Sequence, residues 1–124
     1  MAIGKRITAL AFIGFGITVA AGCAYDKKEV VHPPCIIPAT VTYTAQIEPI
    51  LRNNCYRCHS ATSLISGIQL DSYAALKVYA QNGQLYGVTS HAPGFRPMPD
   101  DGGKLDDCSI ATIKRWIDTG TPEN

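Results

Sequence analysis

The sequence lacks the features of a nucleic-acid-binding or membrane-spanning protein. Its 124 residues contain 11 Lys and Arg against 10 Asp and Glu, so the net charge is only +1. A polybasic segment that could bind a phosphate backbone is missing, as are internal repeats and low-complexity tracts. The uncharged run near the N-terminus, residues 7–21, is shorter than the about 20 apolar residues of a membrane span. The chain length predicts one small domain.

Residues 1–22 have the layout of a secretory signal peptide. Lys5 and Arg6 form a basic segment, residues 7–21 an apolar segment, and residues 20–22 a cleavage point of small residues. Cys23 follows directly, and this arrangement resembles the lipobox of bacterial lipoproteins, with Ala20 where a lipobox usually has Leu. The resemblance implies that Cys23 is lipidated and anchors the chain to a membrane of the bacterial cell envelope, facing the periplasm. The alternatives are an uncleaved anchor, or an ordinary signal with an incidental Cys23.

The remaining chain divides into a tether and a domain. Residues 23–39 hold charges and prolines that disfavour a helix, so we expect them to be extended. Residues 40–124 form the domain. In it we expect a helix from Thr42 or Thr44 to residue 54, a loop at 60–69, a helix over 73–81 and a loop over 84–103. A last helix is capped by Asp106, Asp107 or Ser109 and ends at Gly120.

The motif Cys55-Tyr56-Arg57-Cys58-His59 is C-x-x-C-H, the pattern of c-type haem attachment. Two thiols add across the two vinyl groups of one haem, and the histidine that follows is carried to the iron as an axial ligand. We therefore predict one haem c, bound covalently through Cys55 and Cys58 and ligated by His59. A dithiol redox site would need a βαβ context, and a zinc site would need a second pair of ligands, and the sequence offers neither.

A second axial ligand is expected from Met98, the only methionine after the signal peptide. It lies in Arg96-Pro97-Met98-Pro99, where two prolines restrict the backbone. The alternative is a methionine that only packs against the haem or the core. His91 is the rival ligand, and His32 in the tether is a weaker one. Ligation by His59 and Met98 would raise the reduction potential relative to two histidines and saturate the iron.

Two cysteines, Cys35 and Cys108, remain after these assignments. In an oxidising compartment such a pair suggests a disulfide, which would join the tether to the start of the last helix. The alternative is two separate thiols.

Taken together, these motifs resemble small bacterial class I c-type cytochromes over about residues 40–122. The resemblance is carried by residues 47–51 (IEPIL), 55–60 (CYRCHS), 67–71 (GIQLD), 96–99 (RPMP) and 113–120 (IKRWIDTG). It implies an all-α cytochrome c fold, with three to four short helices and long loops around one covalently bound haem. By the same analogy Leu70 and Tyr73 would line the haem, and a propionate would be reached by Tyr86, Arg96 or Trp116.

The function expected from these features is single-electron transfer between redox protein partners. We expect no enzymatic activity, no binding of nucleic acid, and contact with a membrane through lipidated Cys23. The alternative is a haem domain that binds or senses O2, NO or CO, which requires that Met98 be displaced from the iron.

Overall fold

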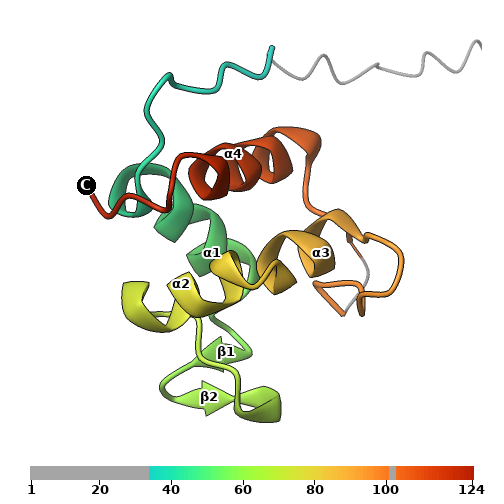
Figure 1. The fold of residues 1–124 in the computed structure, drawn as a ribbon. Coiled ribbons are helices and arrows are strands. Elements are labelled where there is room, and N and C mark those ends of the chain that lie inside the picture. The colour runs from blue at the N-terminus through green and yellow to red at the C-terminus, as the bar shows by residue number, and fades with distance from the viewer. Residues whose placement is uncertain (1–33, 101–102) are drawn as a thin grey trace, which may run out of the picture. The chain divides into compact units, whose positions relative to one another are not determined.

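The computed structural model (Figure 1) describes residues 34–100 and 103–124. The chain divides into two units, at Val31 and His32, and all described residues belong to the second unit. Outside the described residues lie the predicted signal peptide, Cys23 and the part of the predicted tether up to residue 33, which includes His32. In the part of the chain that is described, no helix is long and apolar enough to cross a membrane.

The first helical segment begins at Tyr43, directly after its cap Thr42, and ends at Asn54, within the expected range. It opens with a π-helical turn, η1 (Tyr43–Ile47), which continues into α1 (Glu48–Asn54). The Thr42 hydroxyl accepts a hydrogen bond from the Ala45 N–H, so Thr42 is the cap, and Thr44 is not. Pro49 lies in the first turn of α1, where its missing N–H costs no hydrogen bond.

A short β-hairpin follows and corrects the predicted fold class. β1 (His59–Ser60) pairs antiparallel with β2 (Ser63–Leu64), and a 3-10 turn, η2 (Ile65–Gly67), comes next. We predicted a loop here and an all-α cytochrome c fold. That prediction is wrong, because the described residues combine four α-helices with a two-stranded sheet and do not clearly form that fold. Two-residue strands are too short to show the alternation by which a strand is recognised in a sequence.

Contacts to residues further along the chain hold the hairpin. The Leu70 N–H donates to the His59 carbonyl at 2.9 Å, and the Ala61 N–H donates to an Asp71 carboxylate oxygen at 2.8 Å. The bond from Ala61, together with one from the Gln69 side-chain amide, lowers the pKa of Asp71, since both stabilise its charged form. The hairpin is therefore a product of tertiary contacts, and local propensity does not reveal it.

Two helices occupy the middle of the described chain. α2 (Tyr73–Gln81) has the predicted bounds, and the Ser72 hydroxyl caps it by accepting from the Ala75 N–H. α3 (Gln84–Ser90) lies where we predicted a loop. It begins after Gly83, which has φ +83° and no side chain with which to cap the helix. The Asn82 side-chain oxygen accepts from the Gln84 N–H at 2.9 Å, and burial of one face of α3 adds to its stability.

The last helix, α4 (Asp107–Asp118), is capped by Asp106. The Asp106 carboxylate accepts from the Ser109 N–H at 2.9 Å and from the Ser109 hydroxyl at 2.6 Å. Both bonds lower the pKa of Asp106. Of the three caps considered above, the structure therefore selects Asp106. The apolar face of α4 carries the fully buried Trp116 and packs against η1 and α3.

One core joins these elements. The C-terminal residues return to its edge, where the indole N–H of Trp116 and the N–H of Tyr43 both donate to the Pro122 carbonyl, at 2.8 and 3.0 Å. Figure 1 shows the hairpin at the end of the unit that is remote from α4. The buried apolar side chains are Val41, Tyr43, Ile47, Leu51, Leu70, Leu76, Ala80, Leu85, Leu105, Ile110, Ile113 and Trp116.

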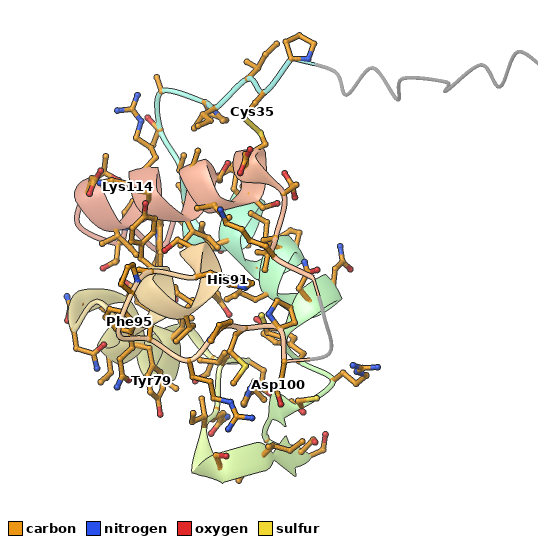
Figure 2. All side chains as sticks on the ribbon, turned by 90° about the vertical axis from the view of Figure 1, so that its right-hand side faces the viewer. Cys35, Tyr79, His91, Phe95, Asp100 and Lys114 are labelled. Carbon is orange, nitrogen blue, oxygen red and sulfur yellow. A yellow bond between two sulfur atoms is a disulfide. The ribbon has the colours of Figure 1, made fainter. Side chains whose placement is uncertain are left out.

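A disulfide joins Cys35 to Cys108, as predicted, and closes a loop across 73 residues of sequence. It connects the segment that precedes η1 to the first turn of α4 (Figure 2). In the chain-entropy account, a crosslink over this distance restricts the unfolded chain and thereby stabilises the folded one.

Replacing both bridged cysteines, Cys35→Ser with Cys108→Ser, should lower the free energy of unfolding by about 4 kcal/mol. Chemical denaturation followed by circular dichroism measures this difference. Cys35→Ser alone should lose the same amount, since either substitution opens the loop. Equal denaturation midpoints for the wild type and the double variant would show that the crosslink contributes nothing.

Candidate cofactor site

A cavity of about 770 Å³ lies between the turn after α1, the segment that follows β2, helix α3 and the loop that follows α3. Its volume is in the range of small-molecule and cofactor sites. Figure 2 shows Tyr79, Phe95 and Asp100, which line it, around the region between α3 and the hairpin. Of the residues predicted to bind a cofactor, five line this one cavity: Cys55, Cys58, His59, Leu70 and Met98.

The two motif cysteines lie on a turn that continues directly from α1. The N–H groups of Cys58 and His59 both donate to the Cys55 carbonyl, at 3.1 and 2.9 Å. This geometry turns both cysteines and the histidine toward one space. Tyr56 packs against the core instead, with its hydroxyl 3.4 Å from the Tyr43 hydroxyl. Burial, together with that contact, raises the pKa of Tyr56, so its phenol stays neutral.

Neither cysteine of the motif is in a disulfide. Burial, and then the neighbouring Cys58, raise the pKa of the Cys55 thiol to about 11. Redox-active dithiols have thiol pKa values that are lowered, into the range of about 3.5–7.5, because the thiolate is the reactive form. The environment of Cys55 therefore argues against a dithiol oxidoreductase. Across residues 34–100 and 103–124, no group of three or more His, Cys, Asp and Glu side chains could hold a metal ion.

His59 has a ring nitrogen that the polypeptide leaves without a partner. Its Nδ1 is buried and has no hydrogen bond among the described residues. A buried polar atom in this condition costs about 1–3 kcal/mol unless another group satisfies it. The His59 carbonyl is bound by the Leu70 N–H, so the backbone of this residue is fixed. Two thiols and an adjacent imidazole lie on one cavity wall, and these are the attachment groups and the axial ligand that a c-type haem requires.

Met98 reaches the same cavity from a separate element, the loop after α3. Its N–H donates to the Val88 carbonyl at 3.0 Å, and its carbonyl lies 3.2 Å from Nε2 of His91. The Met98 N–H is therefore bound to the last turn of α3, and the Met98 carbonyl is bound to the residue that follows this helix. A thioether is a haem-iron ligand in many c-type cytochromes. The side chains that line the cavity therefore fit the predicted haem c.

Some predicted contacts are not found. Tyr73 does not line the cavity, because its hydroxyl donates to the Thr121 carbonyl at 2.8 Å and its ring packs on Tyr43. His91, the rival ligand, is also outside the lining. Among the three propionate candidates, Trp116 uses its N–H on Pro122, and only Arg96 lines the cavity.

The α3 wall is the part of the site that the sequence analysis missed. Leu85, Val88 and Thr89 line the cavity from this helix, and their i, i+3, i+4 spacing is the signal that could have revealed it. Gly83 and Gly87 obscured that signal, because glycine disfavours helices. Two cationic side chains, Arg57 and Arg96, and one carboxylate, Asp100, also line the cavity, and Arg96 pairs with Asp100 at 2.8 Å.

Comparison of the chain with protein-family models, with curated proteins and with solved structures gives no match.

Gly87 allows the loop that carries Met98 to lie close against α3. A Cβ atom at this position would be 2.5–2.6 Å from carbons of the Phe95 ring. This is a steric clash, and the ring would have to move to remove it. We predict that Gly87→Ala is more costly in the wild type than in a Phe95→Ala background, by about 1–3 kcal/mol. Unfolding free energies of the four proteins in this double-mutant cycle measure the difference. The same effect of Gly87→Ala in both backgrounds would show that the close packing is not energetically important.

Proposed function

We propose that this protein is a mono-haem c-type electron carrier of the bacterial cell envelope. The observation that supports this most directly is that one cavity is lined by both cysteines of the C-x-x-C-H motif, by its histidine, and by the only methionine of the chain beyond residue 22. Met98 is 39 positions away from His59 in the sequence, and its presence in the same cavity does not follow from the motif. Chance packing of a core methionine does not explain the matching donor set.

In this proposal Cys55 and Cys58 hold the haem covalently, and His59 and Met98 ligate its iron. Buried Leu70 and Leu85 line the cavity and exclude water from the ring faces. Arg57 and Arg96, at the same cavity, would stabilise the negative charge of the haem carboxylates. Both arginines are exposed, so this electrostatic contribution is screened and small.

Haem supplies a one-electron couple when it is bound. The contribution of the chain is to hold its two ligands in place from two separate elements. His59 is fixed by the turn after α1, and Met98 is fixed by its backbone bonds to the end of α3. Ligands that are fixed in this way need little rearrangement when charge changes, which favours electron transfer over the binding of O2, NO or CO. The expected partners are redox proteins that give and accept the electron.

The proposed location rests on the N-terminal sequence and on the disulfide. A signal peptide over residues 1–22 would export the chain, and lipid on Cys23 would anchor it to a membrane. A disulfide between Cys35 and Cys108 suits an oxidising compartment such as the periplasm.

Mass spectrometry of the mature protein tests the covalent chemistry. We expect a chain that begins at lipidated Cys23, contains one disulfide, and keeps one haem under denaturing conditions. The Cys55→Ala/Cys58→Ala variant should lose the haem, whereas the Cys35→Ser/Cys108→Ser variant should retain it. A mature wild-type chain without covalent haem would contradict the proposed function.

Spectroscopy of the oxidised protein tests the role of Met98. The wild type should show the weak far-red absorption band of a sulfur–iron bond, and its reduced form should not bind carbon monoxide. Met98→Ala should abolish the band, lower the reduction potential and allow carbon monoxide to bind. His32→Ala, a control at the rival histidine of the tether, should leave all three properties unchanged. Carbon monoxide binding by a wild type that lacks the band would instead favour the ligand-binding function.

A further inference from the structure

We propose that His91 is a positioning residue for Met98, which holds the methionine backbone so that its thioether remains in the cavity. This inference rests on the proposed function and adds to it a residue that does not touch the haem. The geometry that supports it is the contact between Nε2 of His91 and the Met98 carbonyl at 3.2 Å. A carbonyl can only accept, so the imidazole N–H is the donor. Figure 2 labels His91 next to α3, where the residue is half-buried.

The loop from His91 to Met98 is closed upon α3 at several points. The Ala92 N–H donates to the Gly87 carbonyl at 2.9 Å, and the Phe95 N–H donates to the Ala92 carbonyl at 3.1 Å. The Phe95 ring packs on Gly87, where no side chain intervenes. The loop therefore returns to the helix from which it started, and Met98 lies where it closes.

The two backbone bonds of Met98 are not equivalent. Its N–H is bound by the Val88 carbonyl, a backbone group that any residue at position 88 would supply. Its carbonyl is bound by a side chain, so this second bond depends on the identity of residue 91. Without it, the peptide that follows Met98 loses its connection to α3, and the methionine can turn about the remaining bond.

The backbone of His91 also indicates a specific requirement for its side chain. The residue follows the last turn of α3 with φ 57° and ψ 40°, in the left-handed region. At this position of a helix glycine is the usual residue, and asparagine the usual substitute. Histidine adopts this conformation less readily than glycine, so the backbone alone does not favour the residue found here. His91 does not line the cavity, and therefore it acts through Met98 and is not a ligand itself.

Three substitutions separate the backbone requirement from the side-chain bond. His91→Asn keeps a residue that tolerates the left-handed turn, but its shorter amide cannot reach the Met98 carbonyl. His91→Gln places an amide N–H at nearly the distance of the imidazole Nε2 and keeps the bond. His91→Ala removes the bond and serves as the reference for its complete loss.

The measurement is the affinity of the oxidised holoprotein for imidazole, which competes with the Met98 sulfur, together with the far-red band. We expect His91→Ala and His91→Asn to weaken the band and to bind imidazole about tenfold more tightly, as loss of one hydrogen bond predicts. His91→Gln should stay within about twofold of the wild type, since it keeps that bond. Met98→Ala, which removes the thioether altogether, shows the largest increase in imidazole affinity that loss of the Met98 sulfur can cause.

The outcomes distinguish this inference from the proposed function. A wild type that shows the band, with an Asn variant that behaves like the wild type, would overturn the role of His91 alone. A Gln variant as impaired as the Asn variant would do the same, because the donor would then not be what matters. A haem-containing wild type without the far-red band would overturn Met98 ligation, and the role of His91 with it.

Discussion

The hydrogen bonds that fold Cys55 to His59 into a turn at the end of α1 are the constraint on which the rest of the site depends. They bring two thiols and an imidazole to one wall of the cavity. The turn is itself held from both sides, by Tyr56 against the core and by the Leu70 N–H on the His59 carbonyl. Because α1 packs in the same core as α4, the position of the turn from Cys55 to His59 is coupled to the packing of the whole unit.

Met98, the second ligand in the proposed function, depends on a different kind of support. Met98 lies on an irregular loop, and such loops are positioned by the elements that carry them. Here α3 provides that support at three points. The Phe95 ring packs on Gly87, the Val88 carbonyl accepts from the Met98 N–H, and His91 after the last turn contacts the Met98 carbonyl. The site therefore combines the turn from Cys55 to His59 with a loop that is fixed by tertiary hydrogen bonds. A c-type electron carrier would need both parts to remain in place when its charge changes.

How much could be predicted depended on the range of the interactions. The helices capped by Thr42, Ser72 and Asp106 were recognisable in the sequence because a cap and the spacing of apolar residues are local features. Helix α3 was missed because Gly83 precedes it and Gly87 lies inside it, and both glycines weaken the helical pattern. Burial of one face and the bond from the Gln84 N–H to the Asn82 side chain stabilise it. The hairpin was missed because its strands have two residues each, and the bonds from Leu70 and Ala61 that hold it are not visible as a pattern.

The spacing of residues in the sequence was sufficient to identify Cys55, Cys58 and His59 as a group. Counting the remaining cysteines left Cys35 and Cys108 as a pair. Those inferences need no knowledge of the fold, because the chemistry depends on neighbours in the sequence or on simple counting. The walls of the cavity, the exclusion of Tyr73 from it and the contact of His91 with Met98 were decided only by the packed structure. The physical reason is that each of these depends on where separate elements meet. The free energy of that packing is shared by many residues and is not encoded at any one position.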